Sequence, residues 1–365
     1  MVSLGGRDAG GEFSLTTPLT SGRSSAALDD RPGLHPRRLA RLVDEAVARC
    51  ALDLRDAVVL TEAATGSYAV TPVIAARAGA ARVYSVTRST RFGSVDQVTA
   101  ETLELARVLG VHTRIEFVGQ KRRSVVELAD IVTNSGHVRP IDAEMVGWMK
   151  PTAVIPLMYE AWELRPDDLD VAACRRKGIL IAGTNERHPA IDVFSFLGVL
   201  AVRLLHAAGV AVYGSSVLVV CDNGFGAFIQ RGLEGAGAAV DLVADIAAAK
   251  TATVHDAVLV AMTPRSRPVL SEEGARRIAV AWPGAVVAQY FGDLDRAQLS
   301  SLGVPVWPRQ EPRPGHMGIL PAEVGPEPTV RLQSGGLKAG EVLWRYRESP
   351  PAAARDYIDE FVGMS

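Results

Sequence analysis

The chain has 365 residues, which at about 150 residues per domain predicts two domains, each large enough to bury its own core. Hydrophobic residues make up 48% of the sequence and charged residues 22%, which excludes a wholly disordered chain and a fibrous repeat. With 39 basic and 41 acidic residues the net charge is -2, so neither a nucleic acid nor an anionic membrane is an expected partner.

The three cysteines, Cys50, Cys174 and Cys221, are too few and too scattered for a disulfide framework or a zinc site, so we expect free thiols and no metal. No apolar run approaches the roughly 18 residues of a membrane-spanning helix. Residues 1–34 are rich in Gly, Ser, Asp and Arg and lack the apolar core of a secretory signal. These features predict a cytoplasmic protein that begins with a disordered or loosely attached arm.

Strands and helices alternate over residues 35–189, which is the pattern of a mostly parallel sheet with helical crossovers. The apolar periodicity predicts helices at 37–51, 70–80 and 124–129. It predicts strands at 57–60, 82–86, 113–118, 130–133, 153–158 and 178–182. We therefore expect a first doubly wound domain with six strands, of the kind that binds substrate.

A long apolar helix at 191–208 leads into a second series of strands. These strands are predicted at 216–220, 239–243, 256–261, 285–289 and 304–307. We expect residues 190–325 to form a second domain of the dinucleotide-binding type and residues 326–365 to pack back on the first domain. The predicted fold class is α/β, with two tandem Rossmann-like parallel-sheet domains and a cleft between them.

Two segments, 129–183 and 255–308, share one order of features. Each has a strand, a turn with Arg-Pro, a helix, a strand, an acidic turn with Asp-Leu-Asp, a helix and a final strand. This ordered set favours duplication of one supersecondary plan, so both cores should share a topology. Ligands of such sheets bind beyond the carboxyl ends of the strands, and the residues that follow each strand are therefore candidates for the site.

Residues 217–245 have the strand, turn, helix, strand and final acidic residue of a dinucleotide-binding unit. The glycine motif is altered, because Cys221 and Asn223 replace its first two glycines and only Gly226 is kept. Asp245 stands where a carboxylate accepts hydrogen bonds from ribose hydroxyls, which favours NAD and leaves NADP as an alternative. The predicted cofactor-binding residues are Cys221, Asn223, Gly224, Phe225, Gly226, Asp245, Thr263 and Pro264. A motif that now only shapes the fold remains the other interpretation.

Polar residues follow several other strands. A guanidinium at Arg139 suits a carboxylate, and the imidazoles of His137 and His316 suit proton exchange near neutral pH. The predicted catalytic residues are His316, His137, Arg139 and Glu160, and the predicted substrate-binding residues are Thr65, Gly66, Ser67, Asn134 and Asn185. We expect Arg139 and His316 to face each other across the cleft, with Asp293 as a further cleft carboxylate. Alternatively, Arg139 pairs with a neighbouring carboxylate and only braces its loop.

The segments 142–189, 191–205 and 217–240 resemble the D-2-hydroxyacid dehydrogenase superfamily, which includes formate and glycerate dehydrogenases, and more distantly S-adenosylhomocysteine hydrolase. The resemblance implies an NAD-dependent oxidoreductase acting on a small carboxylate-bearing metabolite as a homodimer. His316 is similar to the family's catalytic histidine, whereas Tyr290, Phe291 and Gly292 stand where the family has its Ala-Arg-Gly turn. A lyase, hydrolase or transferase on the same scaffold, or a ligand-binding homologue without catalysis, therefore stays open.

Overall fold

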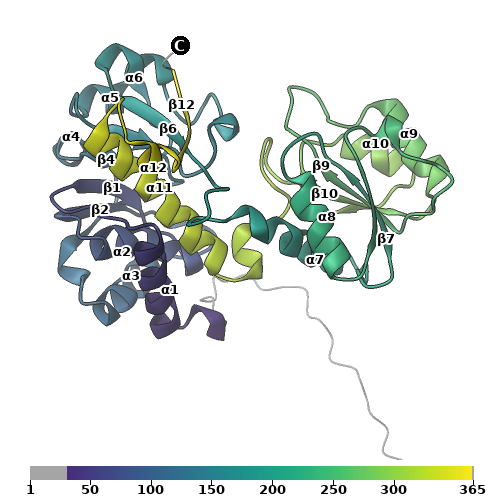
Figure 1. Cartoon of the computed structure of the whole chain (residues 1–365), viewed down its shortest axis with the longest axis horizontal. Coiled ribbons are helices and arrows are strands. Elements are labelled where there is room, and N and C mark those ends of the chain that lie inside the picture. The colour runs from purple at the N-terminus through teal and green to yellow at the C-terminus, as the bar shows by residue number, and fades with distance from the viewer. Residues whose placement is uncertain (1–30, 364–365) are drawn as a thin grey trace, which may run out of the picture.

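The computed structural model describes residues 31–363 and shows two α/β domains, each built around its own sheet (Figure 1). This confirms the predicted fold class. Most of the predicted arm, residues 1–30, lies outside the described residues. None of the helices over residues 31–363 has the length and apolarity that a membrane crossing requires.

The first sheet has seven strands in the order β12-β6-β5-β4-β1-β2-β3. Its parallel strands are β1 (Val58–Glu62), β2 (Arg82–Val86), β3 (Ile115–Val118), β4 (Ile131–Val132), β5 (Val154–Pro156) and β6 (Leu180–Thr184). These six were predicted from the sequence. The seventh strand, β12 (Ile358–Phe361), was not, and it pairs antiparallel with β6. A lone strand of four residues carries little periodicity, and its partner lies far away in the sequence.

Helices cover both faces of this sheet (Figure 1). One face packs on α1 (Pro36–Arg49), α2 (Val70–Arg77) and α11 (Glu327–Tyr346), with α3 (Val95–Val108) beside them. The other face packs on α4 (Arg123–Val126), α5 (Ala143–Trp148) and α6 (Val171–Lys177). The remaining elements are α12 (Ala352–Arg355) and four single turns of 3-10 helix, η1 (Pro32–Leu34), η2 (Gly66–Ala69), η3 (His112–Arg114) and η4 (Ala161–Glu163).

Helix α11 lies directly against the sheet because glycines line its inner face. A Cβ atom added at Gly335 would lie 2.6 Å from Ile191 Cδ1, and one added at Gly336 would lie 2.5 Å from Met158 Sδ. No side chain fits between the helix backbone and these neighbours. The helix carries the chain from the second domain back across the first, as Figure 1 shows.

The second sheet is fully parallel, with strands in the order β11-β10-β9-β7-β8. The strands are β7 (Ser216–Val220), β8 (Ala239–Val243), β9 (Ala257–Ala261), β10 (Val286–Phe291) and β11 (Val306–Trp307). The helices are α7 (Leu197–Ala207), α8 (Gly226–Gly235), α9 (Glu272–Ala281) and α10 (Arg296–Ser301), with single turns η5 (Phe194–Phe196), η6 (Ile246–Ala248) and η7 (Pro321–Val324). Over the described residues, this order matches that of the parallel strands of the first sheet except that no strand corresponds to β3.

The same contacts recur in the two cores, as expected for a duplicated plan. Asp130, before β4, accepts the Val58 N–H at the start of β1 at 2.9 Å. Asp256, before β9, accepts the Ser216 N–H at the start of β7 at 2.8 Å. The last residue of each Asp-Leu-Asp turn caps the following helix, Asp170 for α6 and Asp295 for α10.

The chain crosses between the domains twice, first near residues 185–193 and again near residues 320–327 (Figure 1). The two crossings are tied together, because Arg331 Nη1 donates to the Asp192 carboxylate at 2.9 Å and to its carbonyl oxygen at 3.3 Å. The second domain is therefore held to the first by two neighbouring segments.

Candidate functional site

A cavity of about 560 Å³ lies between the two domains, beyond the carboxyl ends of their strands. Its first-domain wall includes Tyr68, Arg139, Tyr159 and residues 162–166. Its second-domain wall includes residues 263–266, Phe291, Asp293 and residues 314–317. Arg139 and His316 therefore line one cavity from opposite domains.

Asp168 accepts hydrogen bonds from three side chains of the first-domain wall. Its Oδ2 accepts hydrogen bonds from Arg139 Nη1 at 3.0 Å, Tyr159 Oη at 3.0 Å and Arg165 Nη2 at 2.9 Å. Burial acts to raise the pKa of Asp168, but the charges of Arg139 and Arg165 and these hydrogen bonds outweigh it, so the pKa is lowered. Asp168 is ionised at neutral pH, and the two guanidinium groups keep further N–H donors for a ligand.

Arg165 joins the two walls. Its Nη1 lies 3.2 Å from His316 Nε2, and His316 Nδ1 lies 3.0 Å from the Pro314 carbonyl oxygen. Both contacts are satisfied when Nδ1 carries the proton and Nε2 accepts from the guanidinium. Arg165 was not among the residues predicted from the sequence, although it lies in the acidic turn that follows β5, where a search for candidates could have found it.

Asn134 supports Tyr159 from inside the protein. The amide is fully buried, and its Nδ2 donates to Tyr159 Oη at 2.6 Å. Among residues 31–363 no donor reaches Asn134 Oδ1. Burial, followed by the nearby charge of Asp168, raises the pKa of Tyr159, so its phenol stays protonated and can donate to Asp168. Asn134 therefore lies behind the cavity wall and fixes the position of the Tyr159 hydroxyl, which lies in that wall.

His137 and the Thr65–Ser67 turn lie outside this cavity. The His137 backbone N–H donates to Glu62 Oε2 at 2.6 Å, and burial lowers the pKa of its imidazole. The Gly66 N–H donates to Glu101 Oε2 at 3.2 Å. This amide, a predicted donor to a substrate, is therefore bound by a carboxylate of the chain itself.

Glu160 and Asn185 have structural partners. Glu160 is buried, accepts from Trp162 Nε1 at 2.8 Å and from Arg187 Nε at 3.2 Å, and has its pKa raised by burial. It lines a smaller cavity of about 290 Å³ together with Asn223, Gly224 and Phe225. Asn185 Nδ2 donates to the Asp356 carbonyl oxygen at 2.8 Å and so holds the C-terminal segment, outside both cavities.

The altered glycine loop is held by its asparagine. Asn223 Nδ2 donates to the Ala261 carbonyl oxygen at 3.0 Å, and its Oδ1 accepts the Phe225 N–H at 3.0 Å and the Cys221 Sγ–H at 3.3 Å. A Cβ atom at Gly226 would lie 3.2 Å from Leu242 Cδ1, so this glycine allows the close approach of α8 to β8. The loop keeps the close helix-to-strand packing that the third glycine allows. Where the first two glycines are replaced, the hydrogen bonds of Asn223 hold the turn.

Aromatic rings pack across the domain boundary beside this loop. The Phe225 ring lies 5.3 Å from that of Phe194 and 5.8 Å from those of Trp162 and Phe291, measured between centroids. Trp162 comes from the first domain and is 40% exposed. Phe194, Phe225 and Phe291 belong to the core of the second domain, and Trp162 packs on that core from the first domain.

Asp245 lies in a third cavity of about 440 Å³, beyond the end of β8. Its Oδ1 accepts the Ala247 N–H at 2.8 Å, which leaves Oδ2 for another partner. Thr263 lines both the interdomain cavity and the smaller one, and Arg265 lines both the interdomain cavity and the third one. The three cavities therefore follow one loop, residues 263–267, along the carboxyl edge of the second sheet. Asp222 braces this loop by accepting from the Thr263 N–H at 2.7 Å and from Arg265 Nη2 at 2.7 Å.

No protein-family model and no curated protein matches this sequence. Among solved structures, the A chain of dipicolinate synthase from Bacillus halodurans is similar, with 11% identity, a TM-score of 0.50 and coverage of 82% of this chain and 100% of that chain. The A chain of dipicolinate synthase from Bacillus subtilis has 11% identity, a TM-score of 0.50 and coverage of 80% and 97%. At this identity the likeness establishes the two-domain Rossmann-type fold.

A D-isomer specific 2-hydroxyacid dehydrogenase and a formate dehydrogenase are also among the similar structures. An NAD-dependent formate dehydrogenase from Staphylococcus aureus in complex with NAD is among the similar structures, with 8% identity, a TM-score of 0.44 and coverage of 79% of this chain and 94% of that chain.

Proposed function

We propose that this protein is an NAD-dependent oxidoreductase that acts on a small carboxylate-bearing metabolite in the interdomain cavity. The observation that carries the proposal is the meeting of Arg139, Arg165 and His316 at one cavity, beside a loop that continues into the cavity of Asp245. A carboxylate clamp, a proton-exchanging group and a place for a nucleotide along the same edge are the components of such a site.

The residues of the second domain fit a dinucleotide. Asp245 Oδ2 would accept from the ribose hydroxyls of adenosine, Gly226 keeps α8 close to the sheet, and Gly224 is exposed in the turn between β7 and α8. The side chain of Asn223 is bonded to Ala261 and Phe225, which holds it against the protein. When bound, the nicotinamide would supply the hydride exchange.

In the interdomain cavity, the chain's own residues bind and orient the substrate. The free N–H donors of Arg139 and Arg165 form planar forks that match a carboxylate. His316 would exchange a proton at Nε2 once the substrate replaces Arg165 as its partner. Tyr159 and Asp168 keep both guanidinium groups in place.

Titration of the purified chain with NAD, NADH, NADP and NADPH tests the cofactor assignment. We expect saturable binding, with NAD preferred over NADP. The variant Asp245→Asn keeps an oxygen that can accept the Ala247 N–H but removes the charge that repels a 2′-phosphate, so it should narrow the preference for NAD. If none of the four nucleotides binds up to millimolar concentration, the proposal fails.

The second candidate is a lyase, hydrolase or transferase on this scaffold. It is favoured by the fully buried Tyr290, whose Oη donates to the Leu197 carbonyl oxygen at 3.0 Å, and by Phe291 in the aromatic cluster, because these residues stand where the dehydrogenase family has its arginine. Tight binding of an S-adenosyl compound or a nucleoside without any nicotinamide binding would favour this candidate. A ligand-binding homologue without catalytic activity would bind a ligand but would not convert it to a product.

A homodimer in the cytoplasm remains part of the proposal. Helix α7, the apolar helix that resembles the family's dimer element, exposes Val199 to the extent of 51%. Sedimentation analysis of the full chain should show a dimer, and Val199→Glu should shift it toward the monomer. If the wild-type protein sediments as a monomer, the homodimer part of the proposal fails.

A further inference from the structure

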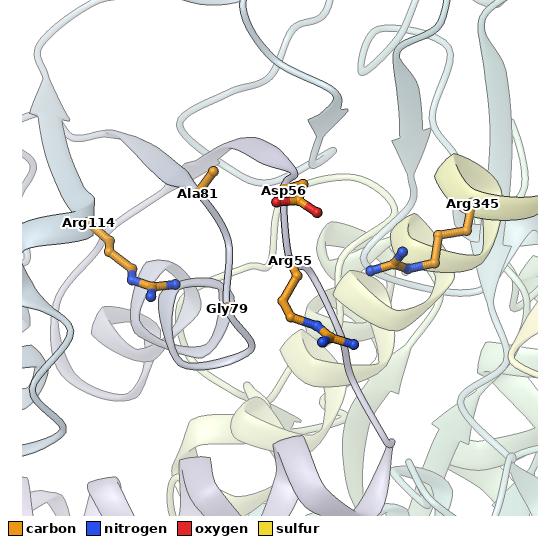
Figure 2. Close-up of a pocket in the computed structure, with 6 residues that line it drawn as sticks. All are labelled: Arg55, Asp56, Gly79, Ala81, Arg114 and Arg345. Atoms are coloured by element: carbon orange, nitrogen blue, oxygen red, sulfur yellow. The ribbon is translucent and has the colours of Figure 1, made fainter.

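A cavity of about 520 Å³ lies at the amino edge of the first sheet, at the opposite ends of the strands from the interdomain site (Figure 2). Arg55 and Asp56 precede β1, Gly79 and Ala81 precede β2, and Arg114 precedes β3. Because these strands are parallel, their starts lie side by side. Arg345, in the last turn of α11, completes the lining.

Two of the three guanidinium groups share one support. Arg55 donates to both carboxylate oxygens of Asp53, at 2.9 Å from Nε to Oδ1 and 2.6 Å from Nη2 to Oδ2. Arg345 Nη2 donates to the Asp53 carbonyl oxygen at 3.0 Å. Figure 2 shows Arg345 reaching from α11 toward Arg55 and Asp56. Arg55 and Arg345 therefore form one side of the cavity.

Arg114 extends from the opposite side, toward the loop that contains Gly79 (Figure 2). Its Nη1 donates to the Ala80 carbonyl oxygen at 3.1 Å, which fixes the guanidinium without neutralising it. Among residues 31–363 no carboxylate forms an ion pair with Arg114. Arg114 is thus a cation of the cavity lining that no carboxylate of residues 31–363 pairs with.

Asp56 adds an acceptor to this basic lining. No cation of the described chain pairs with its carboxylate, and its φ of 71° is in the left-handed region. Gly79 and Ala81, with no side chain and a single methyl group, complete the lining. An anion alone would be repelled by Asp56, whereas a ligand with both an anionic group and hydroxyl donors satisfies the arginines and the aspartate together.

We propose that this cavity binds the phosphate ester of a small polyol, such as a sugar phosphate, as a second ligand site of the protein. The guanidinium groups of Arg114, Arg55 and Arg345 bind the phosphate oxygens, and Asp56 accepts from a hydroxyl of the sugar. The fork of an arginine guanidinium suits a pair of phosphate oxygens. The site goes beyond the proposed oxidoreductase activity, since it lies at the other edge of the sheet.

Calorimetric titration of the full chain with ribose 5-phosphate, inorganic phosphate and ribose tests this site. We expect ribose 5-phosphate to bind saturably and more tightly than inorganic phosphate, and ribose not to bind. Arg114→Gln should weaken the binding of ribose 5-phosphate about tenfold or more, as for loss of a charge-assisted hydrogen bond. Arg123→Gln is the matched control, because Arg123 is an exposed arginine of the same domain outside the cavity.

The variant Asp56→Asn tests the contact with the sugar hydroxyl separately from the contacts with the phosphate. Asparagine tolerates the left-handed backbone, so the fold should be kept. Because asparagine keeps an acceptor oxygen but removes the charge that repels a bare anion, we expect this variant to narrow the preference for ribose 5-phosphate over inorganic phosphate. The proposal is overturned if ribose 5-phosphate fails to bind the wild type at millimolar concentration, or if Arg114→Gln and Arg123→Gln bind it equally well. Equal affinities of wild-type protein for the two phosphates would overturn the assignment of a polyol ester.

Discussion

Arg165 and His316 come from different domains, and the guanidinium Nη1 of the first lies 3.2 Å from the imidazole Nε2 of the second. The contact spans the interdomain cavity and occupies the nitrogen that a substrate would use. Arg165 is held in turn by Asp168, so the position of His316 depends on the same carboxylate that orients Arg139. The groups that we propose to bind the carboxylate and to exchange the proton are therefore connected before any ligand arrives.

The first prediction concerns His316. We expect His316→Asn to lower kcat by about 100-fold or more, because asparagine keeps a polar contact with Arg165 but exchanges no proton near neutral pH. KM should change little. Steady-state kinetics with a 2-oxo or 2-hydroxy acid that supports NAD-dependent turnover would measure both constants. A variant with wild-type kcat would remove His316 from the chemistry.

The second prediction separates the two interpretations of Arg139. Lysine at this position still pairs with Asp168 but cannot form a planar fork to a carboxylate. We therefore expect Arg139→Lys to raise KM with kcat largely retained and with a small change in melting temperature. If Arg139 serves only to brace its loop, the melting temperature will fall and the affinity for substrate will stay as in the wild type.

The third prediction concerns the crossing of α7 and α8. A Cβ atom added at Gly198 would lie 2.6 Å from Gly232 Cα and 2.7 Å from the Phe228 carbonyl oxygen, and these are backbone atoms that cannot turn aside. Gly198→Ala should reduce the free energy of unfolding of the second domain by about 1–3 kcal/mol through overpacking. Chemical denaturation would measure it. Gly235→Ala, which adds a methyl group in open space on α8, serves as the control and should be neutral or slightly stabilising.

The fourth prediction is a pH dependence at Glu163. Burial of its carboxyl, followed by the nearby charge of Glu160, raises the pKa of Glu163 from 4.5 to about 7, although part of the residue remains accessible to solvent. The folded state holds this proton more tightly than the unfolded chain does. Its contribution to stability is therefore fully present below the unfolded pKa of 4.5 and is lost as the pH rises toward about 7.

Melting curves of Glu163→Gln and wild type between about pH 5 and about pH 8 would measure this effect. The wild type should lose more stability than the variant over that interval, because glutamine does not ionise. Glu234→Gln, at an exposed position on α8, should follow the wild type. Parallel curves for Glu163→Gln and wild type would contradict the assignment.

Strand positions were predictable where the residues of the strand and its flanking turns determine them. β2, β7 and β8 have the bounds that the sequence predicts, because each is a short apolar or β-branched run between glycine or polar turns. Helix α3 was missed although Ser94 and Gln97 form a capping box, which is a local signal that could have been used. Helix α11 has three glycines in its middle, so its composition argues against a helix and only its packing explains it.

The site was less predictable because its partners are distant in the sequence. Strand ends correctly placed Arg139 and His316 at one cavity, since parallel strands share a carboxyl edge. Asn185 also follows a strand, yet its side chain is bound by the Asp356 carbonyl oxygen, which comes from the returning C-terminal segment. The pattern of residues around position 185 contains no information about that segment.

The two crossings between the domains make the second domain an insertion into the first, because residues on both sides of it belong to the first sheet. Cutting the backbone at either crossing would leave the domains covalently joined through the other. The tie between Arg331 and Asp192 keeps the two segments adjacent. Two neighbouring attachment points favour opening of the cleft by rotation about the line that joins them, and such a rotation would separate Arg165 from His316.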